Sequence, residues 1–554
     1  MLKNRRLKRL EKEMNHAESY QDWLALAQQH DQISGMQRWR QVDQTNLYDY
    51  ASIRQRLDRL RSLRARHDNV GLLFTLNEGI HGNLGGMGNV KLHEQARAGT
   101  KNLIEDYIDE IVDALRHIAE LDDPDVSLAD KLDFFYRANH CYGRSALMLS
   151  GGGILGFYHL GVVKALVEHQ LLPRVISGSS AGSLIAGVLG THSDEELEQF
   201  FDPANVHFEA RKEATIVDRM VFGKNASIDA HDVQSIIEGL IPDMTFQEAY
   251  EKTGRQISIS VAPAEPHQTS RLLNAIASPN VYIRSAVMAS CAVPGVFPPV
   301  ILTAKNVYGD SQPYLPSRRW VDGSISDDLP AKRLGRLYST NHYIVSMVNP
   351  IVLPFLRDRG RSNPLMDALG KFSVEVAREM LNNYRLQVQS YGSDYPRLSW
   401  LLNGVHSLLD QDYKGDINIV PRFRFYNPLK VLSHITEEEM MQLMQEGEAA
   451  AWPEIRSVDT CTKISRALDD ILERFERGDL KPVRAARRRP KRPARKAASG
   501  KAKTRVKSRT KVAAETRAQR KKQSPRDTAK ANKKPAPVTR AGTKPDKPDV
   551  EQAA

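Results

Sequence analysis

The fold is decided by two neighbouring stretches of sequence, ALMLSGGGILG at residues 146–156 and RVISGSSAG at residues 174–182. In each stretch an apolar run of strand length leads into glycines, and a helical pattern follows. The predicted strands are Ala146–Leu149, Arg174–Ser177, Ile257–Ala262 and Tyr343–Val348, and the predicted helices between the first of them are Phe157–Gln170 and Ser183–Leu189. Strands that alternate with helices indicate an α/β fold with a mainly parallel sheet flanked by helices.

The first glycine run predicts an anion-binding turn. Without Cβ atoms, the backbone N–H groups of Gly151, Gly152 and Gly153 can crowd around an anion at the start of the following helix. The anion is either a dinucleotide pyrophosphate or the oxyanion of an acyl-transfer reaction. The spacing from Gly151 to Gly156 fits the dinucleotide fingerprint, but the next strand does not end in the acidic residue that a Rossmann fold needs.

The second glycine run, Gly178-Ser179-Ser180-Ala181-Gly182, is a GxSxG motif between a predicted strand and a predicted helix. This context is typical of a nucleophile elbow, in which a tight turn presents the serine hydroxyl above the sheet. Gly178 and Gly182 let the neighbouring chain approach without Cβ clashes. Parallel neighbouring strands place Ser180 and the first glycine turn at the same sheet edge, as a nucleophile and its oxyanion hole require.

A serine nucleophile needs a base, and the residues leave two alternatives. Asp322, in Trp320-Val321-Asp322-Gly323-Ser324, follows a short apolar segment and could accept the proton if partial burial raised its pKa. The other alternative is a Ser–Asp–His triad with His342, His406 or His434 as the base. Spacing alone does not decide between dyad and triad.

Taken together, these three motifs resemble the patatin-like phospholipase family. Four further segments resemble its triacylglycerol lipase branch, which carries an N-terminal helical domain: LPRVI at 172–176, SPNV at 278–281, ASCAVPG at 289–295 and NHYIVS at 341–346. The resemblance covers roughly residues 10–440. It implies that Ser180 is the nucleophile, Asp322 the base of a Ser–Asp dyad and the Gly151–Gly153 amides the oxyanion hole. Gly156, Gly178, Gly182 and Gly323 support the motifs, and neither a metal nor a cofactor is implied.

The resemblance implies a serine acyl hydrolase that cleaves fatty-acyl esters of acylglycerols. Many relatives carry an acidic residue and a basic residue where this chain has Ser150 and Leu155, so we expect a neutral acylglycerol rather than a phospholipid. On that view Leu155→Arg leaves hydrolysis of a soluble ester largely unchanged. The alternatives are a phospholipase, a lysophospholipid acyltransferase or a catalytically silent adaptor that binds lipid or polyanions. The HxxxxD pattern of acyltransferases occurs at His117–Asp122, but in a helical run.

Composition divides the chain into four predicted regions. They are a helical N-terminal domain (1–142), the catalytic α/β domain (143–350), a helical C-terminal extension (351–478) and a tail (479–554). From residue 481 onward the chain holds 26 Lys and Arg against 5 Asp and Glu, and no aromatic residue. We expect this tail to be disordered and to attract polyanions without reading nucleic-acid sequence.

The sequence also predicts where the protein works. Cys141, Cys291 and Cys461 form no CxxC pair, which is typical of reduced cytosolic thiols, and no apolar run is long enough to span a membrane. We therefore expect a cytoplasmic protein that associates peripherally with a membrane or lipid-droplet surface. The basic helix near the N-terminus, with Leu7, Leu10 and Met14 on one face, could contact such a surface or pack on its own domain.

Overall fold

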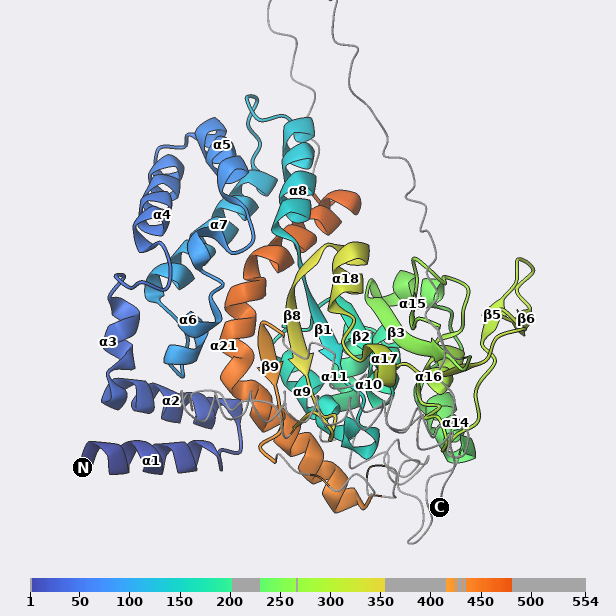
Figure 1. The fold of residues 1–554 in the computed structure, drawn as a ribbon. Helices are drawn as coiled ribbons and strands as arrows, with labels where there is room; N and C mark the ends of the chain where they lie inside the picture. Colours follow the sequence, from blue (N-terminus) through green and yellow to red (C-terminus); the bar gives the residue numbers. More distant parts are fainter. Residues whose placement is uncertain are drawn as a thin grey trace, which may run out of the picture. The chain divides into compact units, whose positions relative to one another are not determined.

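The protein is described by a computed structural model that covers residues 2–201, 230–265, 268–353, 415–423, 426, 431 and 435–480 (Figure 1). The basic tail from residue 481 and the histidines 406 and 434 lie outside these residues. Among the described helices, none combines the length and the apolar composition needed to cross a bilayer.

The centre of the molecule is a seven-stranded, mostly parallel sheet. Its order is β4-β3-β2-β1-β8-β9, and β7 pairs with the far end of β3. β4 and β7 are antiparallel to β3, and the other pairings are parallel. The strands are β1 (Arg144–Leu149), β2 (Val175–Gly178), β3 (Gln256–Pro263), β4 (Arg271–Asn274), β7 (Trp320–Asp322), β8 (Thr340–Ser346) and β9 (Ile417–Ile419). The predicted mainly parallel sheet is confirmed.

Helices cover both faces of this sheet, because its strands are apolar on both sides. Successive side chains of a strand point to opposite faces. Leu147 and Leu149 of β1 therefore join a core with α9 (Gly156–Glu168), α10 (Ala181–Thr191) and α21 (Glu437–Glu476). Ala146 and Met148 join a smaller core with α18 (Ala331–Tyr338) on the other face. The smaller elements around the sheet are η2 (Gly153–Leu155), α11 (Asp194–Phe201), α14 (Ala230–Leu240), α15 (Phe246–Thr253), α16 (Ile283–Ser290), α17 (Ser324–Asp327), β5 (Thr303–Lys305) and β6 (Ser311–Pro313).

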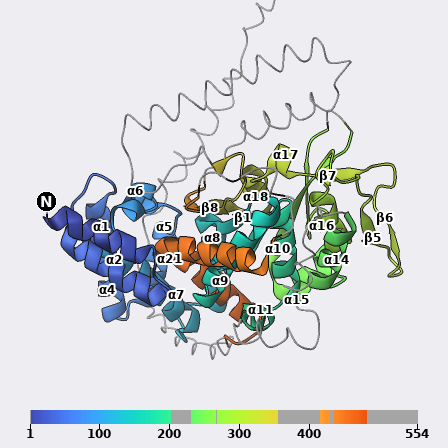
Figure 2. The same cartoon turned by 90° about the horizontal axis from the view of Figure 1, so that it is seen from below.

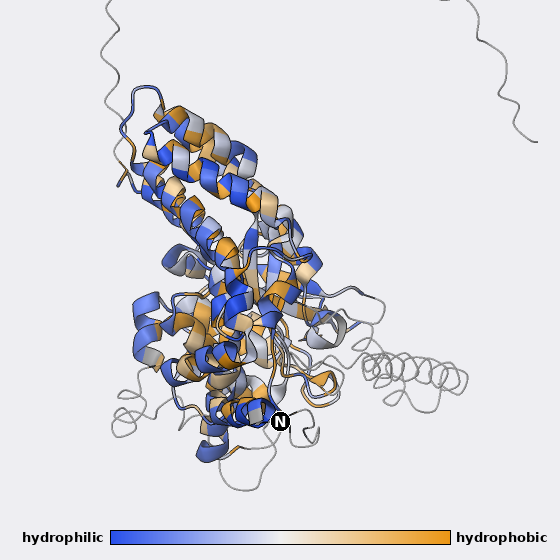
Figure 3. Cartoon of the chain, turned by 90° about the vertical axis from the view of Figure 1, so that its left-hand side faces the viewer, coloured by the Kyte–Doolittle hydropathy of each residue, from blue (hydrophilic) through white to orange (hydrophobic). Residues whose placement is uncertain are grey.

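The N-terminal region is helical, as expected, and has its own core. Its helices carry polar and apolar residues along each length (Figure 3). They are α1 (Leu2–Met14), α2 (Tyr20–Ser34), α3 (Met36–Gln41), α4 (Tyr50–Ala65), α5 (Asn69–Gly79), η1 (Leu84–Gly86), α6 (Val90–Gln95), α7 (Asn102–Glu120) and α8 (Leu128–Tyr142). In α1, Leu10 and Met14 are buried, so most of the predicted apolar face packs on the protein itself.

One long helix joins the two cores. The first half of α21 contributes Met440, Leu443 and Ile455 to the core beneath the sheet. Its second half contributes Leu468 and Ile471 to the core of the N-terminal helices. Figure 2 shows α21 running from the N-terminal helices to α9 and α10. Much of the predicted helical C-terminal extension, residues 354–414, lies outside the described part of the chain.

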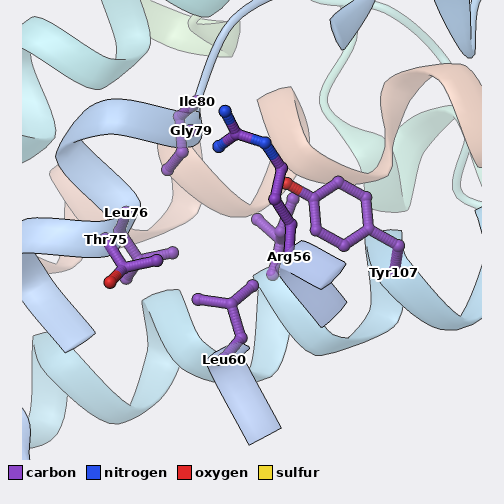
Figure 4. A pocket seen from close by; sticks show the side chains of 8 residues that line it. Arg56, Leu60, Thr75, Leu76, Gly79, Ile80 and Tyr107 are labelled. Carbon is purple, nitrogen blue, oxygen red and sulfur yellow. The ribbon is translucent and has the colours of Figure 1, made fainter. Parts of the chain in front are cut away.

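A small cavity lies between α4, α5 and α7 of the N-terminal region (Figure 4). The guanidinium of Arg56 hydrogen-bonds the Tyr107 hydroxyl there. A Cβ on Gly79 would lie 3.1 Å from Arg56 Nη1, so this glycine leaves room for the guanidinium. The cavity measures about 10 Å³, which is room for one water molecule at most. It is therefore no candidate for a substrate site.

Candidate active site

Ser180 lies on a strained turn at the carboxyl edge of the sheet. It follows β2, precedes the first residue of α10 and has φ 50° and ψ −123°. A positive φ at a residue with a side chain costs free energy and persists only where the surroundings enforce it. Leu149 and Gly178 are register partners in β1 and β2, so the two glycine turns leave the sheet side by side.

Two glycines allow the turn to close against β1. A Cβ at Gly178 would lie 2.1 Å from the carbonyl oxygen of Gly182, and a Cβ at Gly182 would lie 2.3 Å from that of Leu149. Gly156, at the start of α9, has the same role, because its Cβ would lie 2.8 Å from the Cβ of Ala181. These contacts give a physical reason for the glycines that the sequence analysis selected as motif-supporting.

Ser290, whose role sequence reasoning missed, fixes the backbone of the Ser180 turn through a hydrogen bond. Its hydroxyl accepts the Ser180 N–H at 2.9 Å and donates to the Ser260 carbonyl oxygen at 2.8 Å. Ser290 ends α16 and is fully buried. It therefore ties the strained residue to β3. Ser290 lies in the segment 289–295 that carries part of the resemblance, but its spacing gave no signal of this role.

Asp322 reaches Ser180 through an antiparallel strand. β2 pairs with β3 so that Gly178 lies opposite Ile259, and β7 pairs with β3 so that Asp322 lies opposite Val261. Ser180 follows Gly178 by two residues, and Val261 follows Ile259 by two residues. Asp322, the partner of Val261, therefore lies at the same height along the strands as Ser180. The Ser180 hydroxyl lies close enough to the Asp322 carboxyl to lower its pKa. Gly323 permits this approach, because its Cβ would lie 2.5 Å from the Ser260 carbonyl carbon.

The environment of Asp322 changes its acidity. The residue is 3% exposed. Burial disfavours the charged carboxylate and raises its pKa from 3.8 to about 6, although hydrogen bonds from Ser324 and Ser180 oppose the shift. The Ser324 N–H donates to Oδ1 at 2.8 Å. A carboxylate with a pKa near 6 is ionised at neutral pH and is a better proton acceptor than an ordinary aspartate.

The glycine turn faces Ser180, but its three amides are not equivalent. A Cβ on Gly151 would lie 3.3 Å from the Ser180 Cβ. The Gly151 N–H, however, donates to Asp328 Oδ1 at 2.8 Å. It is therefore not free to bind an oxyanion, which corrects the expectation that all three amides do so. Among the described residues, the N–H groups of Gly152, Gly153 and Ala181 have no hydrogen-bond partner.

Ala181 is a candidate oxyanion donor that the sequence analysis overlooked. Its N–H directly follows Ser180 in the chain and starts α10. In hydrolases with this elbow, the amide after the serine is one of the two oxyanion donors. The position after the serine of GxSxG was thus a usable signal.

Asp328 is a second buried carboxyl beside the turn. Its Oδ1 accepts the Gly151 N–H, and its Oδ2 accepts the Asn349 Nδ2 at 3.2 Å. Burial raises its pKa to about 7, and the neighbouring Asp322 and Asp327 add to the rise. Because its N–H already donates to Asp328, Gly151 cannot donate to a pyrophosphate. The dinucleotide interpretation of the glycine spacing is therefore disfavoured.

His159 supports the turn from the α9 side. Its Nε2 bonds the Ser150 carbonyl oxygen at 2.9 Å, and its Nδ1 lies 2.7 Å from the Ser346 hydroxyl. The carbonyl can only accept, so Nε2 carries the proton and Nδ1 accepts from Ser346. Burial lowers the pKa of His159 to about 4, so the ring is neutral and structural.

The triad alternative fails for His342. This residue pairs with Ser145 at the amino end of β1, and its Nδ1 lies 2.9 Å from the Ser145 hydroxyl. Ser145 precedes Leu149 by four residues, so His342 lies about 13 Å from the catalytic edge along the strand. His117, of the HxxxxD pattern, bonds Asn69 in the N-terminal helices, away from the sheet.

Leu155, which the sequence analysis chose for substitution by arginine, is fully buried in the main core. An arginine there would bury an unpaired charge and destabilise the protein. The substitution therefore cannot test substrate preference. Among the described residues, no group of three or more His, Cys, Asp or Glu side chains could hold a metal ion.

Comparisons with known proteins match both halves of this architecture. Residues 147–334 match the model of the patatin-like phospholipase family, and residues 1–140 match a domain of unknown function, DUF3336. The chain is 35% identical to triacylglycerol lipase SDP1L of Arabidopsis thaliana over 474 residues, which are 83% of this chain and 58% of that protein. It is 34% identical to triacylglycerol lipase 4 of Saccharomyces cerevisiae over 82% of this chain and 52% of that protein.

A further relative is matched over more of its length. A patatin-like phospholipase domain-containing protein of Neosartorya fischeri is 32% identical over 519 residues, which are 87% of this chain and 71% of that protein. The chain thus spans little more than half the length of the two lipases and about seven tenths of this third protein.

Proposed function

The chain belongs to the patatin-like phospholipase family, and on that premise we propose that it is a serine acyl hydrolase that releases fatty acids from acylglycerols. One observation carries the proposal. Ser180 lies on a strained elbow, and its hydroxyl is near the buried Asp322, whose pKa is raised to about 6. A structural serine needs neither the strained backbone nor a carboxylate partner adjusted towards neutral pH.

The first half of the reaction forms an acyl-enzyme. Asp322 takes the Ser180 proton as Oγ attacks the ester carbonyl carbon, and the carbonyl oxygen becomes an oxyanion. The amides of Gly152, Gly153 and Ala181 are the candidate donors to this oxyanion, each worth about 3 kcal/mol of barrier. Asp322 then gives the proton to the departing glyceride oxygen, and the ester bond to glycerol breaks.

The second half hydrolyses the acyl-enzyme and regenerates the free enzyme. Asp322, again ionised, takes a proton from water as the water oxygen attacks the acyl carbonyl. Collapse of the second tetrahedral intermediate breaks the bond to Ser180 Oγ, which regains the proton from Asp322. The products are a fatty acid and a glyceride with one acyl chain fewer.

Two features support a neutral acylglycerol over a phospholipid. The carboxyls of Asp322 and Asp328 both lie at the glycine turn, and both are buried. The charge of Asp322, which is ionised at neutral pH, disfavours a phosphate close to the reacting ester. The relatives in Arabidopsis thaliana and Saccharomyces cerevisiae carry the name triacylglycerol lipase. We accordingly propose that the protein acts at a lipid surface in the cytoplasm.

The decisive experiment compares fatty-acid release from triolein and from phosphatidylcholine. Wild type should act on triolein, and Ser180→Ala and Asp322→Asn should each lose nearly all activity. A fluorophosphonate probe should label wild type at Ser180 and leave Ser180→Ala unlabelled. Ser145→Ala is the matched control, because it removes a hydroxyl from the opposite edge of the same sheet.

Three outcomes contradict the proposal. Labelling of wild type at another residue, or activity that survives Ser180→Ala, would show that Ser180 is not the nucleophile. Faster hydrolysis of phosphatidylcholine than of triolein would make the protein a phospholipase. Folded wild type that neither labels nor hydrolyses any ester would make it a binding protein.

A further inference from the structure

Two large apolar side chains stand at the tip of a hairpin on the outside of the molecule. Val307 and Tyr308 connect β5 and β6 and are 91% and 87% exposed, the most exposed large hydrophobic side chains of the described residues. Figures 1 and 2 both show this hairpin projecting beyond α15 and α16. Single apolar residues at a surface are common, but a protruding pair at a turn is not.

The backbone of this turn is satisfied from within. Asn306 Oδ1 accepts the N–H groups of Tyr308 and Asp310 at 2.8 and 2.9 Å, and the Asn306 carbonyl oxygen accepts that of Gly309. The Asn306 N–H donates to the Asp310 carbonyl oxygen at 2.8 Å. The tip therefore enters an apolar phase with few backbone donors left unpaired. Unpaired donors are the main obstacle to placing a loop in lipid.

Three exposed apolar residues lie in the segments that lead into and out of the hairpin, and we call them the apolar shoulder: Val296, Ile301 and Leu315. Beside the shoulder, Val300 forms a β-bridge with Trp320 of β7, two residues before Asp322. The segment that leads to Val296 begins at Ser290, whose hydroxyl accepts the Ser180 N–H. It continues through Ala292, whose carbonyl oxygen accepts the Asp322 N–H at 3.0 Å. The apolar surface is thus built from the same segments as the candidate active site.

We propose that the tip of the β5–β6 hairpin inserts into the surface of a lipid particle, with the shoulder lying on that surface. This inference rests on the proposed function, which requires a water-insoluble substrate to be reached from its surface. A tyrosine suits this place, because its ring is apolar and its hydroxyl stays hydrated.

The shape and charge of the tip favour lipid over a protein partner. A stable protein interface buries about 800 Å² on each side, whereas the tip offers two side chains on a convex turn. Lys305, beside the tip, is paired with Glu248, so the tip carries no free cation. Binding should therefore not depend on anionic lipid. Binding through the basic tail should depend on it and weaken in salt.

The test measures flotation with triolein emulsion droplets coated with phosphatidylcholine, at low and at high salt. The double variant Val307→Ser/Tyr308→Ser should partition to the droplets at least about tenfold less than wild type. Tyr308→Phe should bind like wild type, because it keeps the apolar ring. The matched control is Val70→Ser/Phe74→Ser on α5, two side chains that are 54% and 57% exposed.

Hydrolysis of soluble p-nitrophenyl butyrate separates this inference from the proposed function. The hairpin variant should keep full activity on that ester and lose activity on the emulsion. Unchanged flotation of the hairpin variant overturns the inference, and so does an equal loss in the α5 control. Wild type that does not float on these uncharged droplets, or that floats only at low salt, also overturns it. If wild type floats but cleaves no ester, the proposed function is contradicted. The flotation of the hairpin variant then still tests the insertion of the hairpin.

Discussion

Asp322→Asn should stabilise the protein while it removes activity. Burial raises the pKa of Asp322 from 3.8 to about 6, so the folded protein binds this proton more tightly than the unfolded chain does. The free energy of unfolding therefore falls as the pH rises between these two values, and it stays lower above pH 6. Two pKa units correspond to about 3 kcal/mol.

The asparagine removes this cost without leaving an orphaned partner. Its amide oxygen can accept the Ser324 N–H, and its NH₂ group can donate to the Ser180 hydroxyl. At pH 8 the variant should therefore be more stable than wild type by up to about 3 kcal/mol, and near pH 4 the difference should disappear. Loss of the general base should lower kcat by about 10²–10⁴-fold.

The assay is urea unfolding followed by tryptophan fluorescence, at pH 8 and at pH 4, for wild type and variant. The gain at pH 8 should appear as a higher urea midpoint with an unchanged slope. Asp133→Asn is the control, because it removes a carboxylate whose side chain is 66% exposed. A variant no more stable than wild type at pH 8 would refute the reasoning, as would a gain of equal size at both pH values.

Three further predictions concern the same site. The kcat/KM of wild type for a soluble ester should rise with pH through a midpoint near 6, because only the ionised form of Asp322 accepts the proton; a flat profile from pH 5 to 7 would exclude Asp322 as the base. Ser290→Ala removes the acceptor of the Ser180 N–H, so kcat should fall about tenfold while KM changes little; a pure KM effect would contradict a role in holding the elbow. Asp328→Asn keeps an oxygen that accepts the Gly151 N–H, whereas Asp328→Ala does not. The kcat of Asp328→Asn should therefore be near that of wild type, and the kcat of Asp328→Ala should be clearly lower. Equal losses of kcat would show that the charge of Asp328, and not its hydrogen bond, matters.

The local parts of the fold could be predicted because their signals are local. An apolar run that ends in glycines specified β1, β2 and the helices after them to within a few residues. The Ser180 elbow followed from the same pattern, because Gly178 and Gly182 are needed only where two backbones approach this closely. The place of the glycine turn opposite Ser180 followed from parallel pairing.

The long-range parts could not be predicted from spacing. Asp322 meets Ser180 because β7 runs antiparallel beside the end of β3, and no periodicity in residues 320–322 shows that direction. The exclusion of His342 needed its register with Ser145 at the opposite end of β1. Asp328 carries no signal of its own, since an acidic residue before Leu-Pro normally indicates a solvated turn.

The shared helix α21 has a consequence for how the protein is made. A ribosome delivers the chain from its amino end, and early domains usually fold as they emerge. Here α21, which completes both cores, is the last described element. The core beneath the sheet needs its residues up to Val458, and the core of the N-terminal helices needs its residues up to Leu472. The apolar faces of α7 and α9 that pack on α21 therefore stay uncovered until α21 has left the ribosome, and holdase chaperones should bind the nascent chain until then.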